Sequence, residues 1–461
     1  MLEKFFNIFR IPDLRKRVFF TFAMLAVYRL GAWIPTPGVD TQRLALMFNA
    51  QNSSALGLMD LFSGGMLRQM AIFALGIMPY ITASIIFQLL AVVYEPLARI
   101  EKEGELGRRK ITQWTRYMTV LLGVLQSIGI AAILTKQGLV LHPGIGFSLL
   151  TVLTLTAGTT FVMWLGEQIT DRGIGNGMSL LIFAGIVAGL PSGVQDMWQK
   201  LQTDAWGAFT PGVIILLLIG MLLVVAFIVW VERAERRVPI QSARRIVGRR
   251  LIGGQASHLP LKVNSGGVMP IIFAQSILSA PMLLGTSSFV QNNRYLNGIY
   301  QALAPGMPWY ILLTVLGIIF FAYFYVSIVM RPDDIADNFR KSGSFIPGIR
   351  PGRRTSDFIN DILTRITLVG AIYLVLVTLL PTWLLSGIRF DKMWLIGRFF
   401  ENLPNWVTHG MNVNFYFGGT SLLIVVGVAM DTIMQVESQL VMRHYDGFSP
   451  RSGRVRGRKT W

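Results

Sequence analysis

The sequence predicts an all-α, polytopic membrane protein with ten transmembrane helices. Of its 461 residues, 52 % are hydrophobic and only 14 % are charged, whereas soluble domains carry about 25 % charged residues. A helix needs roughly 20 apolar residues to cross a bilayer, and stretches close to that length recur along the chain. Glycine and proline interrupt several of them, which membrane helices tolerate. The predicted spans are residues 18–34, 70–93, 117–135, 147–165, 174–190, 212–231, 263–284, 309–330, 366–385 and 415–430.

The first span follows a basic cluster, as the apolar part of a signal peptide does. Arg15, Lys16 and Arg17 precede it, but the apolar stretch continues into LGAWIPTPG without a small-residue cleavage pattern. Nine further spans follow. We therefore expect this helix to be retained.

The second span is preceded by a stretch that interrupts its own apolar pattern. In LFSGGMLRQMAIFALGIMPY, residues 61–80, the pattern is broken by Ser63, Gly64, Gly65 and the charge of Arg68, and it resumes at Met70. Glycine adopts backbone conformations that other residues avoid. From the residues alone, the break fits an interfacial or re-entrant segment with a glycine turn.

Side chains that carry chemistry are scarce. The chain has no cysteine and only four histidines, which lie far apart, so disulfides, thiolate catalysis and a zinc site are not expected. The sequence contains no Ser-His-Asp arrangement, HExxH motif or phosphate-binding loop. We expect no metal, no cofactor and no enzymatic activity.

The spans are also nearly free of ionisable residues, which coupled transporters use at mid-membrane to carry ions or protons. Arg29 lies within the first predicted span, where we expect it to pack against a neighbouring helix or carbonyl groups. The acidic residues near the spans lie at their ends or beyond: Glu167, Asp171, Glu232, Asp431 and Glu437. A solute transporter and a lipid-processing enzyme remain as rivals, but the chain lacks the residues that either requires.

Basic residues are concentrated on one side of the predicted topology. Of the 42 lysines and arginines, 33 lie in the termini and the loops of one face. Loops that stay in the cytoplasm are enriched in these residues. Both termini are therefore predicted to be cytoplasmic, including the tail at about 439–461.

Two loops of that face, at about 233–262 and 331–365, carry more lysine and arginine residues than are required to set the orientation of the chain in the membrane. Both resemble docking surfaces. Paired arginines suit bidentate contacts with phosphate or carboxylate groups. A nucleic acid, an acidic protein or anionic lipid headgroups could bind there.

Several long motifs resemble the SecY family, the central subunits of bacterial protein-conducting channels, in order and over nearly the whole chain. They are FSGG at 62–65, FALGIMPYITASIIFQLL at 73–90, KEGELGRRKITQWTRY at 102–117, WLGEQITDRGIGNGMSLLIFAGIVAGLP at 164–191, SHLPLKVNSGGVMP at 257–270, ADNFRKSGSFIPGIRPG at 336–352, LTRITLVGAIY at 363–373 and FYFGGTSLLIVVGVAMD at 415–431.

The resemblance implies two pseudo-symmetric halves of five helices, residues 1–196 and 197–461, around an hourglass pore in the bacterial inner membrane. Such a channel passes unfolded secretory polypeptides and releases membrane helices sideways into lipid. An apolar ring would seal it, because a narrow hydrophobic constriction dewets. The motifs assign the ring to Ile77, Ile81, Met178, Ile182, Ile272 and Ile424. The pairs spaced four apart share a helix face, as a ring requires.

The resemblance also implies a plug and a lateral gate. The plug is a short helix at about 57–67, on the outer side of the pore, with a flexible break at Ser63–Gly65. The gate lies between spans two and three on one side and spans seven and eight on the other. Its polar residues either latch it or make structural hydrogen bonds between helices. The implied plug residues are Leu58, Leu61, Phe62, Ser63, Gly64 and Gly65, and the implied gate residues are Ile85, Ile86, Gln88, Leu89, Pro270, Ala274, Gln275 and Ser276.

The partners that the resemblance implies are the SecE and SecG subunits, the SecA motor, the ribosome, signal sequences with their nascent polypeptides, and membrane lipids. We expect the motor or the ribosome to contact Arg350, which lies in the turn PGIRPG, where an alternative is a salt bridge that shapes the loop. The segment 386–414 is longer than the family's usual connection, and we expect a tolerated insertion on the outer face; the alternatives are an interfacial aromatic helix and a docking site for a species-specific partner. The other expected docking residues are Arg244, Arg245, Arg249 and Arg250.

Overall fold

Ten apolar helices form the body of the protein, and each lies where a span is predicted. The structure, a computed structural model, describes residues 11–44, 60, 63–203, 210–242, 245–247, 250–252, 256–285, 293–303, 307–386 and 419–446. The ten helices are α2 (Pro12–Gly31), α5 (Met78–Val93), α7 (Glu105–Lys136), α8 (Ile145–Arg172), α9 (Gly177–Ala188), α11 (Thr210–Glu232), α12 (Met269–Gly285), α15 (Pro308–Val329), α17 (Arg353–Ser386) and α20 (Gly419–Asp446). Six helices of the described chain are long and apolar enough to span a membrane on their own, and further apolar helices are shorter. The prediction of an all-α, polytopic membrane protein is confirmed.

The boundaries of several helices differ from the predicted ones; α7, for example, begins 12 residues before its predicted span. Residues 72–77, predicted as part of the second span, lie in turns, and Ala71 forms an isolated bridge with Pro35. Helix α5 begins only at Met78, with proline in its first turn. Proline suits that position because its missing N–H is not needed there. Helix α17 begins 13 residues before the predicted span and α20 extends to Asp446, because polar turns continue both helices beyond the apolar part. Arg29 accordingly lies in the last turn of α2, where a cation interacts favourably with the helix dipole.

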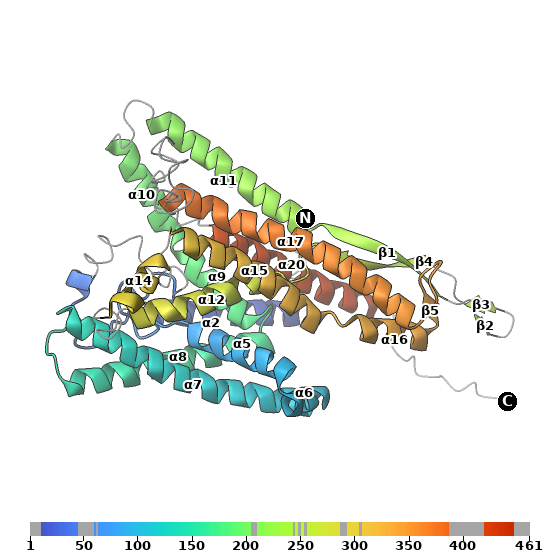
Figure 1. The fold of residues 1–461 in the computed structure, drawn as a ribbon, viewed down its shortest axis with the longest axis horizontal. Helices are drawn as coiled ribbons and strands as arrows, with labels where there is room; N and C mark the ends of the chain where they lie inside the picture. Colours follow the sequence, from blue (N-terminus) through green and yellow to red (C-terminus); the bar gives the residue numbers. More distant parts are fainter. Residues whose placement is uncertain are drawn as a thin grey trace, which may run out of the picture.

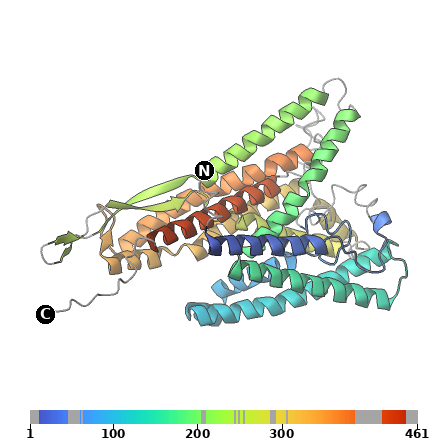
Figure 2. The ribbon, with the colours of Figure 1, turned by 180° about the vertical axis from the view of Figure 1, so that it is seen from behind.

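Four shorter helices lie at the two ends of the bundle. They are α6 (Glu95–Lys102), α10 (Leu190–Gln202), α14 (Arg294–Ala302) and α16 (Pro332–Ser342). Figure 1 shows α10 and α14 at one end, and α6 and α16 at the other; Figure 2 shows the same bundle from behind. The boundary expected between the two halves, at residues 196 and 197, falls inside α10.

The loop predicted at 233–262 contains a β-ribbon that the sequence interpretation missed. Strands β1 (Glu235–Ser242) and β4 (Ala256–Lys262) pair antiparallel, and β5 (Ser344–Phe345) adds to the other edge of β1. Strands β2 (Arg245–Val247) and β3 (Arg250–Ile252) form a separate pair. The ribbon extends from the end of the bundle that also carries α16 (Figure 1). Val238 and Leu261 are buried against Ile359 and Leu363 of α17, which fixes the ribbon to the bundle.

The buried side chains divide into separate clusters, while the outward faces of the helices stay apolar. Phe22 of α2, Leu149 of α8 and Leu222 of α11 are all more than 60 % exposed. An exposed apolar band over many helices is what a bilayer requires of a protein surface. The most extensive helix contacts join α7 with α8, α12 with α15 and α5 with α7.

Candidate functional site

The six predicted ring residues lie together in one hydrophobic cluster, most of them at or close to the start of a helix. Ile77 directly precedes α5 and Ile81 lies one turn into it, with the Ile81 N–H donating to the Ile77 carbonyl over 3.1 Å. The other four come from three helices. Ile182 of α9, Ile272 of α12 and Ile424 of α20 are buried with Ile77, whereas Ile81 and Met178 are partly buried. Four helices, two from each predicted half, thus contribute aliphatic side chains to one apolar centre.

The start of α9 is fixed so that Met178 faces this cluster. The Asn176 side chain caps the helix by accepting a hydrogen bond from the Met178 N–H over 3.1 Å. The thioether of Met178 lies in space that a side chain at Gly166 would occupy, so the glycine of α8 makes room for it. Methionine suits such a position because its flexible chain fills irregular gaps.

A compact turn leads into α5, and we call residues 63–70 the turn segment. The Asp60 carboxylate accepts a hydrogen bond from the Arg68 N–H over 2.9 Å, and the Ser63 hydroxyl donates to the Asp60 carbonyl over 3.0 Å. Both Gly64 and Gly65 have positive φ angles, of 70° and 83°. The predicted break is therefore present. Leu58, Leu61 and Phe62 lie outside the described residues.

The turn segment contacts the cluster that contains the ring. Met66 is only 1 % exposed and belongs to the same cluster as Ile77 and Ile182. Gly64 packs on α9, since a Cβ atom there would lie 2.5 Å from the Cα of Gly185. Burial raises the pKa of the Asp60 carboxyl, against the opposing effects of the Arg68 N–H and the Arg68 charge. The buried Asp60 carboxylate thus stabilises a turn that packs against the cluster of the ring residues.

The predicted gate residues line a contact between α5 and α12. Ile85 is buried in one cluster with Phe273 and Ala274, and Leu89 is packed against that cluster. Pro270 and Ser276 are also buried on α12, whereas Ile86 is half-buried on α5. Helix α7 packs on α5, and α15 packs on α12, so two helix pairs meet at this contact.

The two glutamines of this contact differ in their hydrogen bonding. The Gln88 amide donates to Ser84 of its own helix over 3.2 Å. This hydrogen bond lies within α5, and the two roles expected for Gln88, a latch of the gate or a bond between helices, stay predictions. The Gln275 Oε1 atom is buried and accepts no hydrogen bond from the described residues. A buried carbonyl oxygen without a donor makes this contact easier to part.

The basic end of the molecule carries Arg350 on an ordered turn. Its side chain is exposed, and its carbonyl accepts a hydrogen bond from Thr355 over 2.9 Å. Within the described residues Arg350 makes no ion pair, and its docking role and the alternative salt bridge both stay predictions. Arg245 and Arg250 lie in β2 and β3, while Arg244 and Arg249 lie outside the described residues. The segment 386–414 is outside them too, except for Ser386 at the end of α17.

Comparison with known proteins places this arrangement in a family. The model of the SecY family matches residues 71–433 of the chain. The chain belongs to the SecY family. A curated SecY relative, the protein translocase subunit SecY of Pseudomonas aeruginosa, is 46 % identical over 440 residues, which cover 95 % of this chain and 93 % of the relative.

Two solved structures share the SecY fold. One is of a protein-conducting channel, with a TM-score of 0.62 and 15 % identity, covering 94 % of both chains. The other is of a SecY protein whose plug domain stabilises the closed state and maintains a membrane seal, with a TM-score of 0.61, 17 % identity and the same coverage. The fold of a ten-helix channel protein is thereby confirmed for this chain.

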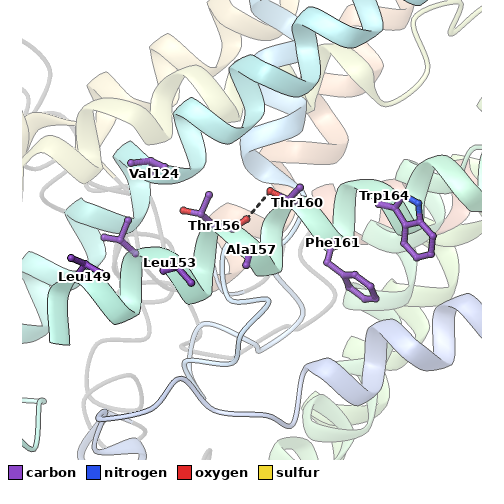
Figure 3. A pocket seen from close by; sticks show the side chains of 9 residues that line it. Val124, Leu149, Leu153, Thr156, Ala157, Thr160, Phe161 and Trp164 are labelled. Carbon is purple, nitrogen blue, oxygen red and sulfur yellow. Dashed lines mark hydrogen bonds between the residues drawn. The ribbon is translucent and has the colours of Figure 1, made fainter. Parts of the chain in front are cut away.

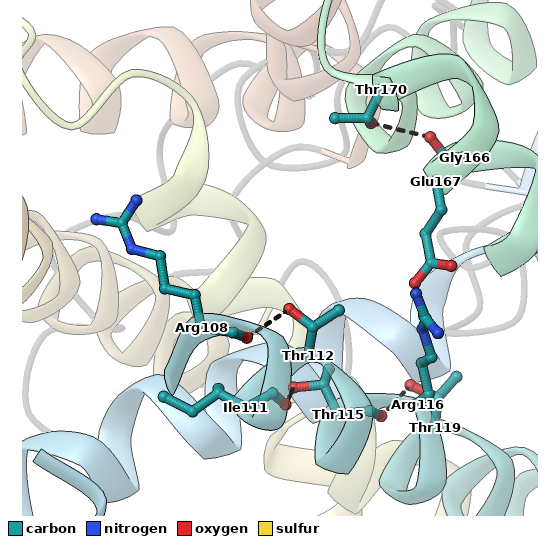
Figure 4. A network of polar contacts seen from close by, with 9 residues as sticks. All are labelled: Arg108, Ile111, Thr112, Thr115, Arg116, Thr119, Gly166, Glu167 and Thr170. Carbon is teal, nitrogen blue, oxygen red and sulfur yellow. Dashed lines mark hydrogen bonds and ion pairs between the residues drawn. The ribbon is translucent and has the colours of Figure 1, made fainter. Parts of the chain in front are cut away.

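An ion pair that neither the SecY motifs nor the spacing indicated joins α7 to α8. Figure 4 shows Arg116 and Glu167 pointing toward one another, with 2.7 Å between Arg116 Nε and Glu167 Oε1. The Glu167 side chain is 16 % exposed and that of Arg116 is 48 % exposed. The two residues lie 51 positions apart, so no local signal could have paired them.

An apolar groove of about 830 Å³ lies on the outer surface of α7 and α8 (Figure 3). Its lining includes two threonine hydroxyls and the indole of Trp164, and the Thr160 hydroxyl donates to the Thr156 carbonyl of its own helix. Lipid chains or an apolar partner helix suit such a surface, and it offers no group for catalysis. Among the described residues no cluster of histidine and acidic side chains could hold a metal ion. The lining residues are Val124, Leu149, Val152, Leu153, Thr156, Ala157, Thr160, Phe161 and Trp164.

Proposed function

We propose that this chain is the channel subunit of a bacterial protein translocase. It passes unfolded secretory polypeptides across the inner membrane and releases hydrophobic helices sideways into lipid. One observation carries the proposal: six apolar side chains, from four helices and the residue before α5, belong to or pack against a single hydrophobic cluster that contains Met66 of the turn segment. The membership in the SecY family supports it.

The apolar cluster acts as the ring that closes the pore. A hydrophobic constriction expels water and so blocks ions, and it offers no hydrogen bonds that would hold a passing peptide. Ile77, Ile182, Ile272 and Ile424 are branched and buried, which suits a tight seal. Ile81 and Met178 complete the ring at its partly buried side.

The plug, predicted at about 57–67, closes the pore above this ring, and residues 63–67 of the turn segment belong to it. Its seat on Gly185 and the burial of Met66 support a resting position in contact with the seal. A short turn held by a few hydrogen bonds can leave as a unit, since it shares no long helix with its neighbours. Ser63, Gly64 and Gly65 supply the break on which it moves.

The contact between α5 and α12 acts as the lateral gate. The helices α5 and α7 would move as one side and α12 with α15 as the other, because each pair is packed together. A hydrophobic signal sequence replaces the apolar contacts of Ile85, Leu89 and Ala274 when the sides part. The gate residues thus exchange one apolar partner for another.

The energy for transport comes from partners on the cytoplasmic face. The SecA motor or the ribosome docks on the end that carries β1, β4 and Arg350, and both termini lie on that side. The subunits SecE and SecG complete the complex, with the halves at 1–196 and 197–461 moving around the pore. The chain itself acts as a channel subunit rather than as an enzyme.

Transport of a secretory protein tests this function. The chain is reconstituted with SecE and SecG in proteoliposomes, with SecA, ATP and an unfolded substrate added outside. Substrate protected from protease is expected only when its signal sequence is intact. A correctly assembled complex that protects no substrate would contradict the proposal, and saturable flux of a small solute would favour a transporter.

A further inference from the structure

The turn that carries Arg350 has a conformationally restricted backbone. It joins β5 to α17 through PGIRPG, where Gly348 and Gly352 adopt positive φ angles of 82° and 110°. The Ile349 N–H donates to the carbonyl of Ile346, which is buried under the sheet, over 3.1 Å. Two prolines further restrict the backbone. Arg350 therefore leaves a fixed turn rather than a loose loop.

Two buried hydroxyls at the start of α17 have different partners. Thr355 is 1 % exposed, and its Oγ1 donates to the Arg350 carbonyl over 2.9 Å. Ser356 is 7 % exposed, and its Oγ donates to the Asp333 carboxylate of α16 over 2.6 Å. Both backbone N–H groups donate to the Gly352 carbonyl. The first hydroxyl thus holds the backbone of Arg350 itself, while the second joins two helices.

This arrangement fixes where the Arg350 guanidinium can reach. The side chain is exposed and has no ion-pair partner within the described residues, so it is available to an approaching surface. A planar guanidinium binds a carboxylate best when its two parallel donors arrive in one orientation. Fixing the backbone beforehand lowers the entropy that binding must otherwise overcome.

We propose that Thr355 is a positioning residue, which presents Arg350 to a carboxylate on the docking motor protein. The proposal rests on the function proposed above, in which Arg350 is a docking residue. The Thr355 hydroxyl makes no contact with the partner. It acts only through the Arg350 carbonyl, and removing it leaves the charge of Arg350 in place but loosens the backbone from which that side chain extends.

Four variants of the full chain, reconstituted with SecE and SecG, test this role. Thr355→Val keeps the shape and removes the hydroxyl, and Thr355→Ser keeps the hydroxyl. Ser356→Ala removes the neighbouring buried hydroxyl, which does not touch Arg350. Arg350→Ala removes the charge. For each, the SecA concentration that gives half-maximal translocation ATPase is measured together with the maximal rate and the melting temperature.

We expect Thr355→Val to raise the half-saturating SecA concentration about fivefold, the scale of one weakened polar contact. Thr355→Ser should restore the original value, and Ser356→Ala should leave it unchanged even if it lowers the melting temperature. In an Arg350→Ala background, Thr355→Val should have no further effect. If the Thr355→Val variant does not accumulate in the membrane, Thr355→Ala also removes the hydroxyl and takes its place in the test.

Three results would overturn the positioning role. Thr355→Val could saturate like the original chain, Ser356→Ala could raise the half-saturating concentration equally, or Thr355→Val could still act when Arg350 is absent. Failure of the proposed docking is separable from these. It would appear as unchanged saturation for Arg350→Ala in a complex that translocates normally, whereas failure of the channel function would appear as no translocation by the unmodified chain.

Discussion

Gly64 and Gly185 meet backbone to backbone. A Cβ atom at Gly64 would lie 2.5 Å from the Cα and 2.6 Å from the carbonyl oxygen of Gly185, on the helix α9 that also carries Met178 and Ile182. At Gly65, next in the chain, no atom lies within 4 Å of such a Cβ. Both glycines adopt a positive φ angle, which other residues rarely do. Gly64 must also lack a side chain because a Cβ atom there would clash with the backbone of α9.

Gly64→Ala should therefore unseat the turn segment more strongly than Gly65→Ala. Both variants strain a positive φ angle, but only the first also forces a methyl group into the backbone of α9. Overpacking of this kind costs about 1–3 kcal/mol, enough to lower the ratio of docked to undocked turn by a factor of roughly 5 to 150. Ion conductance of the idle channel in a planar bilayer measures the effect. Equal ion leak through both variants would contradict a functional contact between Gly64 and Gly185.

The buried carboxylate of Asp60 should make the idle seal depend on pH. Burial raises the pKa of Asp60 in the docked turn above its ordinary value of 3.8, whereas an undocked turn exposes the group to water. The docked state then binds the proton more tightly. Its stability is greatest at low pH and is lost as the pH rises through the raised pKa. We expect the leak to fall when only the outer face is acidified.

Asp60→Asn is the matched control for this dependence. An asparagine Oδ1 still accepts the hydrogen bond from the Arg68 N–H, and it carries no charge to desolvate. The variant should show a low leak at neutral pH and no change with outer acidification. A pH dependence that persists in Asp60→Asn would show that another group is responsible, with Arg68 as the charged neighbour to test first.

The ion pair between Arg116 and Glu167 should contribute modestly to holding α7 on α8. Because Arg116 is about half exposed, its loss is expected to cost only about 1 kcal/mol. Reversing either charge alone, as in Arg116→Glu or Glu167→Arg, should lower the melting temperature of the complex. The double reversal should recover most of the loss. Additive losses in the double variant would mean that the two side chains do not interact.

The sequence was most informative where length and apolarity decide the structure. Ten apolar stretches predicted ten helices, because crossing a bilayer requires a continuous apolar segment with its backbone hydrogen bonds satisfied internally. The break before α5 was visible as Ser63, Gly64 and Gly65. The four-residue spacing of Ile77 with Ile81, and of Met178 with Ile182, fits one shared face on each helix.

Contacts between distant segments could not be read from local patterns. All six ring residues were assigned only through the resemblance to the SecY family, and Ile272 and Ile424 have no partner four residues away that would indicate a shared face. The pairing of β1 with β4 was missed because their short alternation lies within a highly charged loop. The contact of Gly64 with Gly185 depends on two segments 121 positions apart, and nothing near either glycine indicates it.

The ion leak of an idle channel with a weakened ring tests the central claim most directly. Ile77→Gly and Ile81→Gly are combined in one variant, and the control combines Leu125→Gly and Ile128→Gly, two exposed apolar residues of α7. Conductance is measured in planar bilayers without motor or substrate. We predict a marked leak from the ring variant and none from the control. If the ring variant assembles and its ion conductance is as low as that of the unmodified chain, the claim that this cluster seals the pore would be contradicted.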